Sequence, residues 1–297
     1  MDDAKFNCPR CGLAFLSMVA LSLLVAGVLF WQRHGRSGGT AQTVTFPDLN
    51  LKAAIESALG QPSGPITVAE MLTLTNLTAS SDNIQDATGL QYATNLTYLD
   101  ISQNELTSIS PLAGLANLAT LYLNHNQVAD LQPLAGLRPL TQLNVANNQI
   151  ADIKPLAGLA SLSMLCLNNN QVADLRPLAG STSLTQLNVT NNRIVDLGPL
   201  ARLGQLNQLD AAHNQVRDLT ALAGLVNLVT LDLNHNQIAD LRPLAGLTFL
   251  TQLNVANNQI TDLAPLTGLT NVGNLCIDNN QITNFLPLAG LGHHAAP

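Results

Sequence analysis

Apolar and polar residues follow one another along most of this chain in a unit that repeats every 22 residues. The apolar half of each unit has the pattern L-x-x-L-x-L-x-x-N-x-[I/V/L], as in residues 140–150. One column of the pattern is asparagine in nine successive units: Asn104, Asn126, Asn148, Asn170, Asn192, Asn214, Asn236, Asn258 and Asn280. A short fixed period is typical of a solenoid, in which every unit buries its apolar face against its neighbours. The sequence therefore predicts a stack of similar coils.

The central L-x-L of each unit predicts a short β-strand. Side chains alternate along a strand, so we expect Leu143 and Val145 to point into the core. Their neighbours Gln142, Asn144 and Ala146 should then point outward. Coils stacked about 4.8 Å apart pair such strands into one parallel sheet. The predicted fold is an α/β solenoid, a right-handed curved coil with the parallel sheet on its concave face.

The asparagine column predicts a structural ladder along the coils. A sharp turn must follow each strand, and it leaves buried backbone groups that need partners. A side-chain amide supplies both a donor and an acceptor, so one asparagine per coil can satisfy groups on either side. Replacing one of them with leucine should cost roughly 1–3 kcal/mol of stability. Repeat stacking explains the column fully, and we assign it no catalytic role.

The second half of each unit reads D-L-x-P-L-A-G-L with small variations. Its carboxylate is suited to accept local backbone N–H bonds and to cap the turn that follows. The column contains Asp86, Asp130, Asp152, Asp174, Asp196, Asp218, Asp240 and Asp262. The proline fixes φ on the back of the coil, where we expect a turn of tight helix too short for an α-helix. Because eight of the 19 acidic residues stand in this column, much of the net charge of −7 is scaffold.

Residues 44–73 predict a helical cap over the first coil. Leu51, Ile55 and Leu59 are spaced as the apolar face of an amphipathic helix. The sequence TVAE at 67–70 fits a capping box that opens a second, shorter helix. Solenoids need such cover at their terminal repeats.

The repeats are expected to occupy residues 74–292, as one degenerate coil and nine regular ones, followed by a tail at 293–297. In the degenerate coil Asp82 stands where the ladder asparagine would be. Residues 117–182 also match 227–292 at a shift of 110 residues, or five coils. The match includes residues outside the repeat consensus, which indicates duplication of a five-coil block.

Residues 12–31 contain no charged side chain and are long enough for a helix to cross a bilayer. We predict an uncleaved transmembrane signal anchor, with Trp31 at the membrane interface. A cleaved signal peptide is the alternative, although its apolar core is normally shorter. Residues 1–11 then form a short cytoplasmic segment and 32–43 a flexible linker. The repeats are expected on the extracytoplasmic side, at the cell surface or in the periplasm.

The four cysteines form two pairs in the sequence, one considered for zinc binding and the other for a disulfide. Cys8 and Cys11 form a single C-x-x-C that resembles half of a zinc knuckle, whereas a closed zinc site needs four ligands. Zinc at this pair and a merely reduced thiol pair are the two interpretations, and a reduced pair fits a cytosolic amino terminus. Cys166 and Cys276 stand five coils apart, roughly 24 Å at about 4.8 Å per coil, which is too far for a disulfide.

The amino-acid composition and the absence of catalytic motifs argue against several classes of function. Hydrophobic residues make up 46% of the chain, charged residues 10% and aromatic residues 3%. This balance suits aliphatic packing and argues against nucleic acid, which needs a basic face. The sequence contains no nucleotide-binding glycine loop, H-E-x-x-H pair or nucleophile elbow, so we expect no enzymatic activity.

The repeat pattern is the leucine-rich repeat pattern, and the helical cap with its D-[L/I]-x-P-L coils resembles the internalin-like bacterial leucine-rich repeat proteins. The resemblance covers residues 44–292. It implies binding of a host or surface protein on the concave face of the sheet. Unlike invasion-type members, the chain shows no immunoglobulin-like domain after the last coil and no wall-sorting signal before Pro297, and we expect the amino-terminal helix to replace wall attachment.

Outward positions of the strands supply the expected ligand site. The candidate residues are Tyr98, Asp100, Tyr122, His125, Gln142, Asn144, Asn188, Asp210, Asp232 and Asn254. Interfaces draw most of their energy from aromatic and arginine anchors, so Tyr98 and Tyr122 are the expected centre. The remaining positions form a polar amide strip that suits a glycan or a weak contact.

Asp210 and Asp232 stand in one column of adjacent coils, with His213 and His235 in the following turns. Two stacked carboxylates attract cations such as calcium, but calcium prefers six to eight oxygen ligands. A pair of solvated carboxylates with raised pKa values is the alternative.

The sequence thus favours a membrane-anchored, non-enzymatic recognition protein with a protein or glycan ligand and no cofactor. Two other interpretations stay open. A cytosolic regulatory scaffold of the phosphatase-regulator type uses coils of the same length. An envelope spacer without a dedicated ligand would fit the block duplication and the plain concave face.

Overall fold

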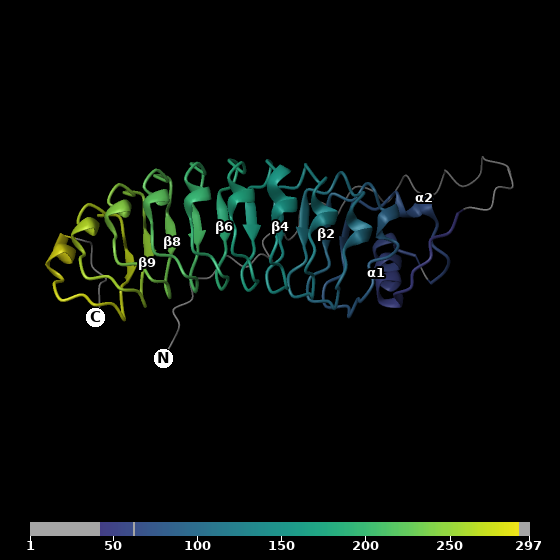
Figure 1. The fold of residues 1–297 in the computed structure, drawn as a ribbon. Coiled ribbons are helices and arrows are strands. Elements are labelled where there is room, and N and C mark those ends of the chain that lie inside the picture. Colours follow the sequence, from purple (N-terminus) through teal and green to yellow (C-terminus); the bar gives the residue numbers. More distant parts are fainter. Residues whose placement is uncertain (1–41, 62, 291–297) are drawn as a thin grey trace. The chain divides into compact units, whose positions relative to one another are not determined.

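The computed structural model describes residues 42–61 and 63–290, which form a solenoid of stacked coils that begins at Thr43 (Figure 1). Each coil contributes one three-residue strand. The strands are β1 (Asn76–Thr78), β2 (Tyr98–Asp100), β3 (Thr120–Tyr122), β4 (Gln142–Asn144), β5 (Met164–Cys166), β6 (Gln186–Asn188), β7 (Gln208–Asp210), β8 (Thr230–Asp232), β9 (Gln252–Asn254) and β10 (Asn274–Cys276). They form one curved parallel sheet in sequence order, as predicted.

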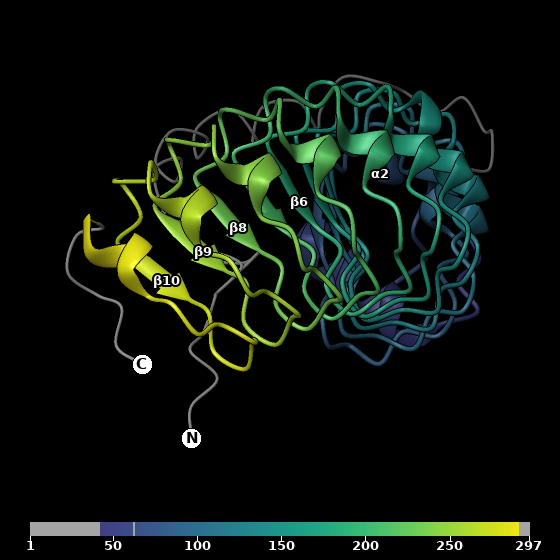
Figure 2. The ribbon, with the colours of Figure 1, turned by 60° about the vertical axis from the view of Figure 1, so that its left-hand side comes forward.

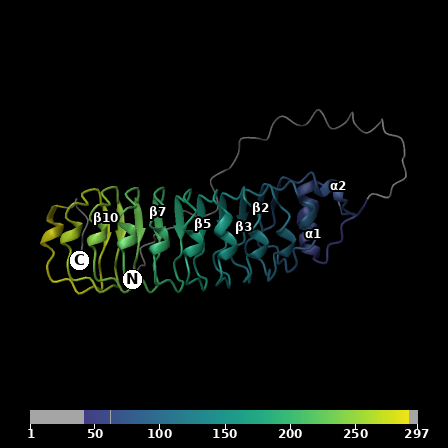
Figure 3. The same cartoon turned by 45° about the horizontal axis from the view of Figure 1, so that its top comes forward.

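The register of the sheet follows the 22-residue period, because residues in the same column of the repeat pair with each other. Leu121 of β3, for example, faces Leu143 of β4. The strands run along one face of the solenoid and short helical turns along the opposite face (Figure 2). Successive coils lie side by side in chain order from the amino-terminal cap to β10 (Figure 3).

The core is a continuous column of aliphatic side chains. Leu143 and Val145 point into it and are 1% and 0% exposed, as the alternation of the strand predicts. Each coil alone is too small to bury these side chains. Stability therefore comes from the contact between neighbouring coils.

The back of each coil is a 3-10 helix, which agrees with the predicted tight turn. These are η1 (Leu90–Tyr92), η2 (Ser110–Leu112), η3 (Gln132–Leu134), η4 (Lys154–Gly158), η5 (Arg176–Leu178), η6 (Gly198–Leu200), η7 (Thr220–Leu222), η8 (Arg242–Leu244), η9 (Ala264–Leu266) and η10 (Leu286–Gly290). The aspartate column caps them as expected. Asp130, for instance, accepts a bond from the Gln132 amide at 2.7 Å, and Asp262 accepts one from Ala264 at 2.8 Å.

The predicted cap consists of α1 (Leu49–Leu59) and α2 (Val68–Met71). Leu51 and Ile55 of α1 are fully buried against the first coil. The first helix ends at Gly60, whose φ of 66° is a left-handed conformation that glycine adopts without strain. The short second helix carries the predicted capping box between Thr67 and Glu70.

Asp48 joins the cap to the repeats through both of its carboxylate oxygens. Its Oδ1 atom accepts bonds from the amides of Asn50 and Leu51 at the start of α1, at 2.9 and 3.0 Å. Its Oδ2 atom accepts bonds from the amides of Gln85 and Asp86 in the first coil, at 2.7 and 3.2 Å. The orientation of α1 on the first coil is therefore fixed by hydrogen bonds as well as by apolar packing.

The opposite end of the described solenoid is more open. Leu253, Val255 and Ile260 of the preceding coil are fully buried. Their equivalents Leu275 and Ile277 are only partly buried, and in η10 Leu286 is 80% exposed.

Several sequence-based predictions fall outside the described residues. They are the membrane span at 12–31 with its flanking segments 1–11 and 32–41, the C-x-x-C of Cys8 and Cys11, and the tail at 293–297. Within the residues that the structure describes, no helix is both long and apolar enough to cross a membrane.

Candidate functional site: the strand-bearing face

The asparagine ladder forms as predicted and leaves these side chains no free group. Asn126 donates from Nδ2 to the carbonyls of Ile101 in the preceding coil and Leu123 in its own, both at 3.0 Å. Its Oδ1 atom accepts a bond from the Leu106 amide at 2.9 Å. Each ladder residue thus binds its own coil and the coil before it. The column is structural and does not take part in the candidate ligand site.

A second column of polar side chains also has a structural role, which the sequence did not reveal. These are the third residues of the strands, which point away from the core. The Oδ1 atoms of Asn144, Asn188, Asp232 and Asn254 each accept a bond from the backbone amide two residues further on, at 3.0 to 3.2 Å. The side chains thereby cap the end of their strand, as an Asx turn does.

The same four side chains are also buried. Asn144, Asn188, Asp232 and Asn254 are between 5% and 9% exposed, because each is packed between its equivalents in the neighbouring coils. The sequence predicted an outward-facing polar amide strip here, and these four side chains are less accessible to a ligand than that prediction implied. A ligand lying on this part of the sheet meets mainly the preceding column, where Gln142, Gln186 and Gln208 are half-buried.

The amino-terminal end of the strand-bearing face is more exposed than the buried column of Asn144, Asn188, Asp232 and Asn254. Tyr98 of β2 and Tyr122 of β3 are half-buried and pack edge to face, with their ring centroids 5.9 Å apart and the rings inclined at 77°. The Tyr122 hydroxyl is 3.1 Å from Oε1 of Gln142. Asp100 is also partly exposed, and its Oδ1 atom accepts bonds from the amide and hydroxyl of Ser102. The structure therefore brings four of the predicted residues together here.

The environment of Tyr98 favours its neutral phenol. Burial raises the pKa of the Tyr98 hydroxyl, and the negative charge of Asp100 raises it further, while a hydrogen bond with the Thr78 side chain acts in the opposite direction. The hydroxyl is therefore protonated at neutral pH. The Tyr98 side chain therefore offers the apolar area of its ring and a hydroxyl group for hydrogen bonding, as interface tyrosines commonly do.

His125 belongs to a third column, which the sequence analysis missed. The residue before each ladder asparagine, and before Asp82 in the first coil, has a positive φ of 51° to 64°. Residues other than glycine seldom adopt this conformation, although asparagine and histidine do so more often than most. The column is Ser81, Gln103, His125, Asn147, Asn169, Asn191, His213, His235, Asn257 and Asn279. The repeated asparagine is the signal that could have revealed it. His125 is exposed in this turn, with its Nε2 atom 3.3 Å from Nδ2 of Asn147.

The carboxylates of Asp210 and Asp232 are not the solvated pair that the sequence suggested. Both are buried, at 6% and 5% exposure, and they stand opposite each other in β7 and β8. Burial raises the pKa of Asp232, against the bonds from Asn234 and the nearby His213. His213 and His235 stack with their ring centroids 4.1 Å apart. Within residues 42–61 and 63–290, no group of three or more His, Cys, Asp or Glu side chains is arranged to hold a metal ion.

Cys166 and Cys276, the two cysteines in the described part of the chain, form no disulfide, as their spacing predicted. Cys166 is buried and Cys276 is half-buried. Burial raises the pKa of the Cys276 thiol, and the charges of Asp278 and Asp232 raise it further. Both effects keep the thiol protonated and therefore weakly reactive.

Comparison with known families agrees with this geometry. A family model for leucine-rich repeats, which describes two copies of the repeat, matches most of the solenoid in six overlapping or adjoining segments. These are residues 94–136, 116–158, 139–180, 160–202, 204–246 and 248–290. No curated protein matches the chain in sequence.

Solved structures of internalins from Listeria monocytogenes are similar along most of the chain. The internalin InlF is 31% identical, with a TM-score of 0.74 over 86% of this chain and 83% of that one. Internalin C2 is 33% identical, with a TM-score of 0.64 over 82% and 99% of the two chains. The functional domain of InlJ, which includes a cysteine ladder, is 26% identical, with a TM-score of 0.75 over 85% of this chain and 56% of that one.

Proposed function

This chain belongs to the internalin-like bacterial leucine-rich repeat proteins, and we propose that it is a non-enzymatic recognition protein that binds a protein ligand at the amino-terminal end of its sheet. The leucine-rich repeat fold itself indicates a protein-binding role. The ligand contacts are assigned to Tyr98, Tyr122, Asp100 and Gln142, with His125 at the edge of the same surface. We call this set the aromatic surface.

One observation carries the proposal. Tyr98 and Tyr122 form an edge-to-face pair whose rings stay half-exposed. In later coils, by contrast, the third strand residues are buried and bonded to the backbone of their own coil, as in Asn144, Asn188, Asp232 and Asn254. Large amphipathic side chains supply contact area at a low cost in conformational entropy, and a few of them dominate most interfaces. In the described repeats, Tyr98 and Tyr122 are the aromatic residues of the strands.

A protein ligand fits this surface better than a glycan does. In the amide strip that suggested a glycan, Asn144 and Asn188 are buried and engaged in Asx turns. The two tyrosines remain as anchors of the type that protein interfaces use. A glycan ligand and a spacer without any ligand are outcomes that the experiment below separates from this proposal.

Photo-crosslinking tests the position of the ligand. The full-length chain carries a photoreactive phenylalanine analogue at Thr120, which is the register partner of Tyr98 and leaves both tyrosines intact. A control chain carries it at the exposed Gln132 in η3, on the helical face. We expect a protein adduct from a cell-surface extract with the analogue at position 120 and none at 132.

Matched variants then measure the contribution of the anchors. Replacing Tyr98 and Tyr122 by alanine should weaken binding of the crosslinked protein by more than roughly 2 kcal/mol, or about thirtyfold. Replacing Gln186 and Gln208 by alanine should have much less effect. A stronger effect of the glutamine pair would place the ligand on the middle coils. An adduct that is a glycan would overturn the proposed ligand class, and no adduct at position 120 would favour a spacer.

The cellular position is part of the same proposal and is supported by the sequence alone. Residues 12–31 are uncharged and of membrane-spanning length, so the repeats are proposed to be anchored on the outer side of a bacterial membrane. The full-length chain should remain with membranes in high salt, and protease added to intact cells should remove the repeats. A soluble chain that starts after Trp31 would show cleavage, and repeats protected from external protease would favour the cytosolic scaffold.

A further inference from the structure

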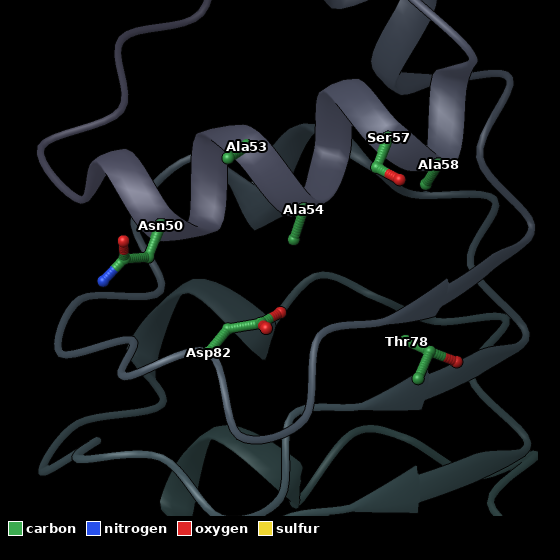
Figure 4. A pocket seen from close by; sticks show the side chains of 7 residues that line it. All are labelled: Asn50, Ala53, Ala54, Ser57, Ala58, Thr78 and Asp82. Carbon is green, nitrogen blue, oxygen red and sulfur yellow. The ribbon is translucent and has the colours of Figure 1, made fainter.

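A groove opens between the cap helix and the first strand of the sheet. It has a volume of about 510 Å³. Helix α1 contributes the small side chains of Ala53, Ala54, Ser57 and Ala58, and the first coil contributes Thr78 and Asp82. Figure 4 shows Ala54 pointing from the helix toward the space in which the Asp82 and Thr78 side chains lie.

Asp82 occupies a special place in the repeat, because it stands at the first position of the asparagine ladder. In the next coil, Oδ1 of Asn104 accepts bonds from the amides of Asp82 and Ile84 at 3.1 and 2.9 Å. Asp82 has no earlier coil to bind in this way, since α1 takes that place and the amides within a helix already bond internally. Its carboxylate instead lines the groove.

The change from asparagine to aspartate also removes the donors of the ladder. The Nδ2 group of Asn104 donates to carbonyls of its own and the preceding coil, at 2.8 to 3.2 Å. A carboxylate only accepts hydrogen bonds at neutral pH. Among the contacts of the described residues, no hydrogen bond or ion pair is made by the Asp82 carboxylate, which is exposed and open to a donor from a ligand.

The charges around the groove specify which donor fits. None of the residues that line it is basic. Lys52 lies on the same helix, but its ammonium is paired with Glu56 one turn further on. Asp100 is the register partner of Thr78 and adds a second negative charge beside the groove. A positively charged group is therefore the complementary occupant.

The small side chains of α1 suit the remainder of such a group. Lysine and arginine carry flexible apolar stems that pack along apolar surface while the charged end reaches a polar partner. The methyl groups of Ala53, Ala54 and Ala58 leave room for a stem of this kind. A divalent metal ion fits poorly, because it needs several oxygen ligands and the groove supplies one carboxylate.

The groove is continuous with the aromatic surface. Thr78 lines the groove and its side chain makes a hydrogen bond with Tyr98, whose ring packs on Tyr122. A ligand seated on the two rings therefore reaches the groove without leaving the sheet.

We propose that the groove between α1 and β1 receives a lysine or arginine side chain of the protein ligand, which pairs with Asp82 while the rest of that ligand lies on Tyr98 and Tyr122. This inference rests on the proposed recognition function and adds the chemistry of one contact to it. It makes the cap helix part of the binding surface as well as a cover for the core.

Alanine methyl groups provide a direct probe of the groove. The full-length chain is labelled with ¹³C at the alanine methyls and titrated with the capped tripeptides Gly-Lys-Gly, Gly-Arg-Gly, Gly-Glu-Gly and Gly-Leu-Gly. We expect the lysine and arginine peptides to shift the resonances of Ala53, Ala54 and Ala58, with millimolar affinity that falls as salt rises. The glutamate and leucine peptides should leave these resonances unchanged.

Two substitutions and one control complete the test. Asp82→Asn restores the residue type of the ladder and should reduce the affinity for the basic peptides by up to roughly fivefold, as loss of an exposed charge pair does. Ala54→Leu should fill the groove and abolish the shifts. Asp130→Asn, a change of the same chemistry on the helical face, should have no effect. Equal shifts with all four peptides, no shift with the basic ones, or full binding by Asp82→Asn would each overturn the proposal.

These outcomes are independent of the test of the aromatic surface. If the tyrosine variant weakens capture of the crosslinked protein but the basic peptides do not move the alanine resonances, only the groove assignment is wrong. If the peptides bind the groove and the tyrosine variant captures the protein normally, the aromatic surface is wrong. Failure of both experiments would remove the recognition site from this end of the sheet.

Discussion

Asn214 accepts a hydrogen bond at Oδ1 from the backbone amide of Ile194, twenty residues earlier, at 3.0 Å. Its Nδ2 group donates to the carbonyls of Val189, Ala211 and Ala212 at 2.9 to 3.2 Å. A single side chain thus closes its own turn and binds the preceding coil. Repetition of this contact makes each coil depend on its nearest neighbours, as expected for a solenoid.

Replacing Asn214 by leucine should lower the free energy of unfolding by roughly 1–3 kcal/mol, because one amide and several carbonyls lose their buried partner. Urea denaturation followed by circular dichroism measures the change. Gln215→Leu alters the adjacent exposed residue and serves as the control, for which we expect less than about 0.5 kcal/mol. Equal effects of the two changes would show that the ladder bonds do not contribute.

Asp232→Asn should stabilise the protein at neutral pH. Asparagine fills the same column in β4, β6 and β9, and its Oδ1 atom can keep the bonds that Asp232 accepts from Asn234. Burial raises the pKa of Asp232 in the folded state above its ordinary value of 3.8, so the buried charge opposes folding at pH 7.

The sign of this effect predicts its pH dependence. As the pH falls through the raised pKa toward 3.8, the folded state takes up the proton first and the penalty is relieved. The difference in urea midpoint between Asp232→Asn and the natural chain should therefore be largest at pH 7, shrink as the pH falls toward 3.8 and be smallest below it. Asp262→Asn, an exposed position, is the control. A constant difference at every pH would contradict the assignment to charge burial.

Ser181→Ala should also stabilise the fold. Ser181 is 1% exposed and stands where Leu159 and Leu203 stand in the neighbouring coils. Its hydroxyl makes no hydrogen bond with any of the residues that the structure describes. Removing an unsatisfied buried hydroxyl should raise the free energy of unfolding by about 1 kcal/mol. Thr182→Ala, at an exposed position next to it, controls for the general effect of alanine. A destabilised Ser181→Ala chain would indicate that the hydroxyl has a bound partner in solution.

The last described coil should open more easily than the central coils. Leu275, Ile277 and Ile282 are only partly buried, whereas their equivalents in the central coils are sealed on both sides. Hydrogen exchange measured by mass spectrometry should be fastest at 275–290 and slowest in the central strands, because local opening there exposes little additional apolar surface. The α1 end, where Leu51 and Ile55 are fully buried, is the internal comparison. Protection that stays uniform up to residue 290 would disprove this expectation.

The sequence by itself determined the elements that repeat. A period of 22 residues fixes which residues pair across the sheet, as Leu121 and Leu143 do, since only one register buries every leucine. The sequence also predicts the ladder asparagines, the aspartate caps and the helical cap. Each of them satisfies backbone groups that a turn or a helix end exposes. These features depend on chemistry within one coil and its neighbour.

Only the tertiary structure decided which outward side chains are accessible. Strand alternation places Asn144 and Tyr122 on the same face, yet Asn144 is sealed between its neighbours and capped to its own strand, while Tyr122 remains half-exposed. Alternation gives the direction of a side chain, and its exposure depends on the size and bonding of residues 22 positions away. For the same reason the groove at Asp82 became visible only once α1 had been placed on the first coil.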